Sequence, residues 1–402
     1  MTRANVVWVS IDSLRSDFLQ AYSPAGNRFT FIDEMAERGC VFENAFPGGN
    51  WTMPSHATML TGVDATSHMI WTWAHRFEAG TRTAFDHFNE AGYSTGCFSI
   101  PQLGSLFSGS AVEFTGSATD PRLLKCIGGD KPFFVFWHTY NVHYPYGMVV
   151  PKDYNDATAD YDHPSRTLNY IRSLIVGGRQ ELVFDSYRRE IQNAARFIRV
   201  ISERLRSLGR LDNTYFIITA DHGEAWEPYT SFHCNFTEEV IRVPLIMSGP
   251  GIEPSRVATP VSLVDLLPTV LELCEIDPGE AADGFDGQSL VHLMSSAGDF
   301  DRPLVIAGPD GVRNKHRYLA IRQGDWMLIS SLGYWRESFH RVNGDGRSEN
   351  LLDKELSAGA IRLLEELRAV VQRHAERVRS KRDTVVELSK VTEKKLQAFG
   401  YV

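Results

Sequence analysis

Apolar runs that alternate with helical segments restrict the fold of this chain more than any other feature. Residues 5–11, 132–137 and 214–219 are short runs of apolar and β-branched residues, typical of buried strands. Helical patterns cover 31–38 and about 184–208. This order of strands and helices favours an α/β fold with a mainly parallel sheet that has helices on both faces. Ligands of such sheets bind at the carboxyl ends of the strands.

The character of the chain changes after Asp286–Leu290. Short strand patterns follow at 317–321 and 326–330, and then a charged amphipathic helix at about 358–379. With 402 residues, 43% of them hydrophobic, the chain is long enough for a large core and a second, smaller one. We predict a catalytic domain at 1–296 and a small C-terminal α+β subdomain at 297–402.

Composition excludes several classes of protein. The formal net charge is -9 and no long basic run occurs, so a nucleic-acid partner is not expected. No stretch approaches the roughly 20 apolar residues of a membrane span. The apolar run at Val6–Val9 is too short for a signal peptide, and the five cysteines are scattered, so we expect a cytoplasmic protein. The sequence does not exclude a homo-oligomer.

Polar residues follow each predicted strand. Asp12 comes after the first strand, His138 to Pro145 after the second, and Asp221-His222-Gly223-Glu224 after the third. A loop at Gly48-Gly49 leads to Thr52 at the start of a predicted helix, with Pro54 in its first turn. The exposed amides of such a turn can bind an anion.

These strand-end residues contain a set of metal ligands. The carboxylates of Asp12 and Asp221, the imidazole of His222 and the hydroxyl of Thr52 together suit one divalent ion, Mn²⁺, Ca²⁺ or Zn²⁺. A free threonine hydroxyl is a poor nucleophile, and metal coordination favours its ionised form. We therefore predict that Thr52 is both a metal ligand and the nucleophile.

The segment Trp51–Gly62 resembles the signature of the sulfatase branch of the alkaline-phosphatase superfamily, Cys/Ser-x-Pro-Ser-Arg followed by a short helix and Thr-Gly. Thr52 stands in place of the Cys or Ser, and His56 in place of the Arg. Each landmark alone is weak, and an Asp-His-Gly-Glu by itself could be a turn. Further segments resemble landmarks of that family in the same order: Asp12–Arg15, Lys131–Phe134, His138–Pro145, Thr219–Glu224, Glu238–Leu245, Val261–Thr269, Asp286–Leu290 and Leu396–Val402.

The resemblance implies an alkaline-phosphatase-like fold, one metal at the ligand set above, and roles for four histidines. His143 and His233 are predicted to be catalytic, in contact with the transferring group or the leaving oxygen. His138 and His56 are predicted to bind substrate, and His56 to support the nucleophile loop in place of the missing arginine. Three further residues are given other roles: Arg15 and Arg242 are expected to pair with nearby acids, and Glu224 either supports the site or faces solvent.

Thr52 also restricts the chemistry. Sulfatases oxidise Cys or Ser at this place to formylglycine, which threonine cannot form. A phosphorylated threonine can be hydrolysed by in-line attack of water. We predict a metal-dependent hydrolase of phosphate mono- or diesters. The alternatives are a sulfuric ester hydrolase without formylglycine, a phosphotransferase to an alcohol, and a non-catalytic metal- or anion-binding relative. Residues 148–180 and 331–349 are candidate loops for recognition of the small-molecule ester.

Overall fold

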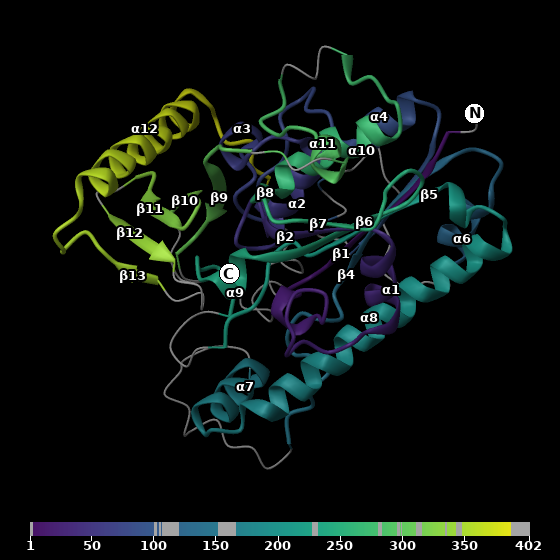
Figure 1. Cartoon of the computed structure of the whole chain (residues 1–402), viewed down its shortest axis with the longest axis horizontal. Helices are drawn as coiled ribbons and strands as arrows, with labels where there is room; N and C mark the ends of the chain where they lie inside the picture. The colour runs from purple at the N-terminus through teal and green to yellow at the C-terminus, as the bar shows by residue number, and fades with distance from the viewer. Residues whose placement is uncertain are drawn as a thin grey trace.

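The computed structural model of the chain describes residues 3–99, 103, 106, 120–151, 166–226, 232–279, 284–295, 298, 300–310, 316–333, 336–342 and 348–386 (Figure 1). The central sheet has the strand order β3-β4-β1-β5-β6-β2-β7, and β8 also pairs with β2. Its strands are β1 (Asn5–Ile11), β2 (Cys40–Phe46), β3 (Ser94–Phe98), β4 (Phe133–Thr139), β5 (Thr214–Thr219), β6 (Val243–Ser248), β7 (Ser255–Val257) and β8 (Val261–Ser262).

The middle of this sheet is parallel, as predicted. β3, β4, β1 and β5 run in one direction, and Ser10 near the end of β1 is level with His138 of β4 and Thr219 of β5. Every residue of β1, β4 and β5 is buried, because helices cover both faces, and this explains their continuous apolar runs. β6 is antiparallel to both β5 and β2. The register brings the polar segments after β1, β4 and β5 to one edge.

Helices cover the two faces of the central sheet. The long α8 runs beside α1 on one side, and α2, α10 and α11 lie on the other (Figure 1). The predicted helix at 31–38 is α1, whereas α8 starts at Gln180, earlier than predicted. The bounds are α1 (Thr30–Arg38), α2 (Thr52–Thr61), α3 (Ala65–His68), α4 (Ala84–Glu90), α6 (Pro121–Gly128), α7 (Arg166–Val176), α8 (Gln180–Ser207), α9 (Glu238–Ile241), α10 (Leu266–Leu273) and α11 (Val291–Ser295).

The C-terminal part forms a second, antiparallel sheet with the order β13-β12-β11-β10-β9. The long helix α12 (Ala358–Ser380) packs on it, with Leu364 and Leu367 beside Leu319 and Leu328 in one apolar cluster. The predicted C-terminal subdomain is thus confirmed, and its boundary at 296/297 stays a prediction. The strands are β9 (Leu304–Gly308), β10 (Tyr318–Gln323), β11 (Trp326–Ser331), β12 (Glu337–Val342) and β13 (Ser348–Asn350).

Three other expectations concern the whole chain. None of the five cysteines forms a disulfide. Among the residues that the structure describes, no helix is long and apolar enough to cross a membrane. Of the predicted recognition loops, 152–165, 334–335 and 343–347 lie outside the described residues, as does the landmark at Leu396–Val402.

Candidate active site

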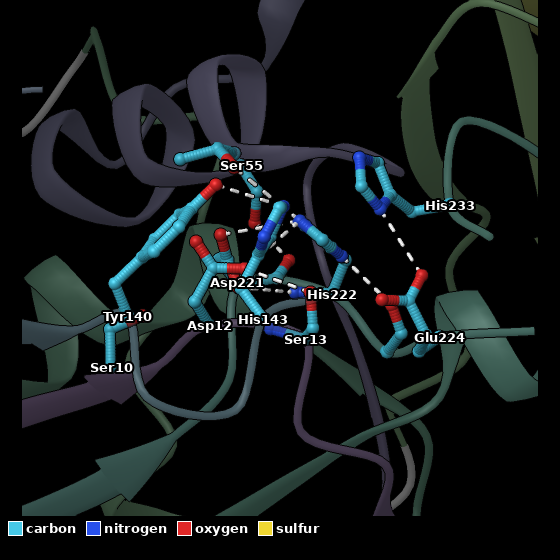
Figure 2. A network of polar contacts seen from close by, with 12 residues as sticks. Ser10, Asp12, Ser13, Ser55, Tyr140, His143, Asp221, His222, Glu224 and His233 are labelled. Carbon is cyan, nitrogen blue, oxygen red and sulfur yellow. Dashed lines mark hydrogen bonds and ion pairs between the residues drawn. The ribbon is translucent and has the colours of Figure 1, made fainter. Parts of the chain in front are cut away.

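The four predicted metal ligands come together at the carboxyl edge of the parallel strands. Asp12 directly follows β1, Asp221 and His222 lie just beyond β5, and Thr52 is the first residue of α2; all four are fully buried. Ligand atoms of Asp12, Asp221 and His222 lie within 4.8 Å of one another. The Thr52 hydroxyl oxygen lies 3.5 Å from His222 Nε2. Figure 2 shows Asp12, Asp221 and His222 directed toward one another.

Close packing fixes the start of α2, and with it Thr52. A Cβ on Gly48 would lie 2.3 Å from the Thr58 side chain, so the preceding loop passes close to the helix only because the residue is glycine. Pro54 occupies the first turn, where its missing N–H costs nothing. Ser55 Oγ donates to the backbone oxygen of Asp221 at 2.6 Å. The start of α2 and the end of β5 are therefore held together directly.

His222 presents its Nε2 atom to the two carboxylates. Its Nδ1–H donates to Gly223 O at 2.8 Å, which leaves Nε2 3.4 Å from Asp221 Oδ2 and 3.8 Å from Asp12 Oδ1. Burial opposes the charged form of His222, but the carboxylates of Asp221 and Asp12 outweigh it and raise the pKa. Burial raises the pKa of Asp12, and nearby His222 only partly offsets this. The cluster thus favours added positive charge.

A divalent cation fits this cluster. Asp221 Oδ2 is buried and has no hydrogen-bond partner among the described residues, which is costly unless a cation is present. His56, His138 and Asp221 also lie close enough for a metal. However, the two histidines point N–H groups at other acceptors, as described next, so the group of Asp12, Asp221 and His222 is the better candidate.

His56 is bonded to the chain through both ring nitrogens, and its predicted contact with substrate stays a prediction. Its Nδ1–H donates to Thr52 O at 2.8 Å, and its Nε2 accepts from Ser10 Oγ at 3.0 Å. Burial and neighbouring His138 lower its pKa to about 3, so the ring is neutral. With both nitrogens bonded and no exposed surface, His56 ties the first turn of α2 to β1. This agrees with its predicted support of the nucleophile loop.

His138 supports the Asp12 carboxylate, and its predicted contact with substrate also stays a prediction. Its Nε2–H donates to Asp12 Oδ2 at 3.0 Å, and its Nδ1 accepts from Ser99 Oγ at 3.0 Å. Burial lowers its pKa to about 4, so this ring too is neutral. The two bonds fix the orientation of Asp12, which is how histidines commonly act around a metal ligand.

The two predicted catalytic histidines lie beside the candidate metal group. The His233 ring is 4.9 Å from the His222 ring and 5.3 Å from the His143 ring. His143 Nδ1–H donates to Tyr144 O at 2.8 Å, and the Tyr140 hydroxyl donates to His143 Nε2 at 3.1 Å (Figure 2). Burial and His233 lower the pKa of His143. The structure therefore brings both histidines to the site, and their roles stay predictions.

Other residues around the site were less well predicted. Glu224 is fully buried and contacts His233, so it supports the site and does not face solvent. Arg15 pairs with Asp17 as expected, whereas Arg242 donates to the backbone oxygen of Glu43. Tyr140 was missed, although it lies within His138–Pro145, a segment already marked as functional. Ser13 and Ser55 were missed as well, and only their place inside the landmarks could have indicated them.

Comparison with known proteins gives the family. The sulfatase family model matches residues 4–108 and 121–276, more than half of the chain. This chain belongs to the sulfatase family. Its members are ester hydrolases, and an enzyme that cleaves phosphoric or sulfuric esters is what the sequence predicted.

Relatives of this sulfatase-family chain include the Escherichia coli sulfatase YidJ, 29% identical over 88% of this chain and 84% of that protein. Choline-sulfatase from Rhizobium meliloti is 31% identical, but the match covers 37% of this chain and 30% of that enzyme. Matches to arylsulfatase K of Xenopus laevis and Mus musculus cover 28% and 24% of those proteins. The matches thus cover less than a third of the length of each of these three relatives.

Two kinds of solved structure share the fold of this sulfatase-family chain. A 2-O GAG sulfatase superposes with a TM-score of 0.73 at 20% identity, over 96% of this chain and 95% of that one. The phosphonate monoester hydrolase of Agrobacterium radiobacter superposes with a TM-score of 0.66 at 17% identity, over 97% and 99%. The alkaline-phosphatase-like fold is confirmed, and it carries both sulfur and phosphorus chemistry in these proteins.

The buried neutral His56 should make this sulfatase-family protein sensitive to acid. In the unfolded chain His56 takes up a proton near its ordinary pKa of 6.5, whereas in the folded protein it stays neutral until about pH 3. The free energy of unfolding therefore falls as the pH drops from 6.5 to about 3. Between about pH 7 and pH 5 we expect the free energy of unfolding of metal-stripped wild type to fall by about 1–2 kcal/mol more than that of His56→Gln. Urea denaturation measures this, and parallel pH curves for the two proteins would contradict it.

Proposed function

We propose that this protein hydrolyses phosphate mono- or diesters of small alcohols through a covalent intermediate on Thr52. One observation carries the proposal: a buried threonine hydroxyl stands at the start of α2, 3.5 Å from His222 Nε2, where sulfatases carry the residue that becomes formylglycine. Threonine keeps a hydroxyl that can attack but cannot form the aldehyde. A phosphoryl group on Thr52 can leave by attack of water, which makes phosphorus the better centre.

One divalent metal would be held by Asp12, Asp221, His222 and Thr52. When bound, it would favour the ionised form of the Thr52 hydroxyl and offset negative charge on the transferring group. The oxygen-rich set suits Mn²⁺ or Ca²⁺, and Zn²⁺ also accepts carboxylate and imidazole ligands.

The residues of the chain would carry out two displacements. In the first, Thr52 Oγ forms a bond to phosphorus, the bond from phosphorus to the alcohol oxygen breaks, and His143 or His233 gives that oxygen a proton. In the second, water attacks the phosphothreonine, loses a proton to the same histidine, and Thr52 Oγ leaves. His56 and Ser55 hold α2 in place meanwhile.

Three alternative functions predict different products. A sulfuric ester hydrolase would release sulfate without formylglycine, a phosphotransferase would pass the phosphoryl group to an added alcohol, and a non-catalytic relative would bind metal without turnover. The fold that the chain shares with phosphonate monoester hydrolases favours a phosphorus ester as the substrate. The fold that it shares with sulfatases supports the alternative of a sulfuric ester.

A panel of four nitrophenyl esters tests the proposal: phosphate monoester, phosphodiester, phosphonate monoester and sulfate. With Mn²⁺, Ca²⁺ and Zn²⁺ tried in turn, we expect kcat/KM for the best phosphorus ester to exceed that for the sulfate by about 100-fold or more, because the Thr52 ester of sulfate lacks an exit route. Repeating the assay with glycerol separates hydrolysis from transfer. A preference for the sulfate ester, or no turnover of any ester, would overturn the proposal.

A further inference from the structure

The loop before Thr52 pairs with the edge strand of the C-terminal sheet. β9 is the last strand in the order of that sheet, and its other side forms a parallel bridge between Ala307 and Gly49. Asn50 N–H donates to Ala307 O at 2.9 Å, and Ala307 N–H donates to Gly48 O at 3.0 Å. Figure 1 shows β9 on the side of its sheet that lies nearest to α2 and β8. The C-terminal subdomain therefore binds the backbone of this loop directly.

The side chain of Asn50 adds a bond to the end of the same strand. Its Nδ2 donates to Pro309 O at 2.8 Å, and the whole residue is buried. A Cβ on Gly308 would lie 1.8 Å from Asn50 Oδ1, so the strand can approach the amide only because this residue is glycine. Gly308 also has a φ of +155°, which other residues rarely adopt. The end of β9 is thus shaped around the Asn50 side chain.

The carbonyl of Asn50 holds a third segment. Cys234 N–H donates to Asn50 O at 3.1 Å, and Cys234 directly follows His233. The φ of Cys234 is +63°, a left-handed conformation that is unfavourable for a residue with a side chain. Such a conformation persists where surrounding contacts fix it. Asn50 therefore joins the loop before α2 both to the C-terminal sheet and to the segment that carries His233.

The C-terminal sheet is well attached where it meets these segments. Ile306 of β9 packs with Phe236 and Val240 in one apolar cluster. On the next strand, β10, Arg322 forms an ion pair with Glu238 at the start of α9, and both side chains are largely buried. Close packing of this kind yields little to small forces. β9 can therefore serve as a fixed support for the loop.

We infer that Asn50 is a positioning residue, through which the C-terminal sheet fixes the place of Thr52. This inference rests on the proposed function. Between the two residues Trp51 has an extended backbone, with φ of −165° and ψ of 172°, so a shift at Asn50 is passed on to the first residue of α2. A displaced Thr52 Oγ would approach phosphorus at a poorer distance and angle, which slows attack without weakening the binding of the ester.

Substitution of Asn50 tests the inference by kinetics. Asn50→Ala removes the bond to Pro309, and we expect it to lower kcat for a nitrophenyl phosphorus ester by about 30- to 100-fold, with KM changed by less than about twofold. The rate at which Thr52 becomes phosphorylated, measured by rapid quench, should fall as well. Asn50→Ser fills more of the space but is too short to reach Pro309 O, so it should show the same pattern. It serves as the second variant if Asn50→Ala does not fold.

Two control variants separate positioning from a general loss of stability. Asn44→Ala removes another asparagine that donates to a backbone oxygen, that of Ala258, at a place away from the loop. Tyr22→Phe removes a buried hydroxyl that bonds to the backbone of Leu245 and should destabilise the fold. Both should keep the wild-type kcat. Thermal unfolding of each variant shows how much stability it has lost.

Amide hydrogen exchange tests the clasp without an activity assay. In metal-free protein, the amides of Asn50 and Ala307 should exchange about tenfold faster in Asn50→Ala than in wild type, while those of β10 stay unchanged. Mass spectrometry of peptides that cover 47–51 and 304–308 measures this. Unchanged exchange at both amides would overturn the inference.

The kinetic outcomes distinguish this inference from the proposed function. If wild type cleaves phosphorus esters and Thr52 is phosphorylated, but the Asn50 variants keep the wild-type kcat, the inference is wrong and the function stands. The inference is also wrong if Tyr22→Phe loses as much kcat as Asn50→Ala, or if the loss lies in KM. If wild type cleaves no phosphorus ester, the proposed function fails, and with it the role of Asn50 in placing a nucleophile.

Discussion

Thr52→Ala should lower kcat/KM for phosphorus esters by at least about 1000-fold and leave the protein folded. The reason is that Thr52 Oγ is the proposed attacking atom, and the structure places it 3.5 Å from His222 Nε2 at a fully buried position. Loss of the hydroxyl removes the covalent route, and water has no equally placed substitute. Steady-state kinetics at saturating metal measure the effect, and circular dichroism checks the fold.

Two matched variants make the Thr52 result specific. Thr52→Val keeps the shape of the side chain and removes only the hydroxyl, so it should be as inactive as Thr52→Ala. Thr52→Ser keeps the hydroxyl and should retain turnover within about tenfold of wild type. Wild-type rates in Thr52→Val would show that another group attacks the ester, and they would refute the role given to Thr52.

The second large effect concerns the metal. Chelation should abolish turnover, and Asp221→Asn should lower it by about 100-fold or more, because Asp221 Oδ2 is a buried carboxylate oxygen within the candidate metal group and has no hydrogen-bond partner among the described residues. Metal binding can be measured without an activity assay, through its effect on the stability of the protein. At about 100 times the dissociation constant, metal should stabilise wild type by about 2.7 kcal/mol and Asp221→Asn much less. Thermal unfolding with and without Mn²⁺, Ca²⁺ or Zn²⁺ measures this.

The metal-stripped proteins provide the control for that prediction. Without metal, Asp12 and Asp221 are two carboxylates within one buried group, and burial already raises the pKa of Asp12. Asp221→Asn removes one of these charges, so the stripped variant should be at least as stable as stripped wild type. If metal stabilises both proteins equally, its site lies elsewhere. If it stabilises neither, the proposed metal site is wrong.

The strand ends explain why so much of the site could be predicted. In a parallel sheet, polar residues that follow buried strands must meet at one edge, so Asp12, Asp221 and His222 could be placed together without coordinates. Thr52 could be added because glycines and a proline mark the start of its helix. The direction of β2 and β6 could not be predicted, because an apolar run does not indicate whether the neighbouring strand is parallel or antiparallel to it.

The roles of the histidines could not be predicted from type and spacing. His56 and His138 come to the centre of the site, but their ring nitrogens are bonded to Thr52 O, Ser10, Asp12 and Ser99. Except for Thr52, which lies on α2 with His56, these partners belong to other segments of the chain, so only the folded arrangement shows that the rings support the site. Glu224 was ambiguous for the same reason, since its partner Tyr146 lies 78 positions away in the chain.

Detection of a phosphoryl group on Thr52 during turnover would show directly whether Thr52 attacks the ester. Wild type is mixed with a nitrophenyl phosphorus ester, quenched in acid on the millisecond scale, digested and analysed by mass spectrometry. We expect the peptide containing Trp51–Gly62 to gain one phosphoryl group at Thr52 during turnover, and we expect that group to be absent from Thr52→Val. Turnover with no modified Thr52 at any quench time, or with the phosphoryl group on another residue, would contradict this expectation.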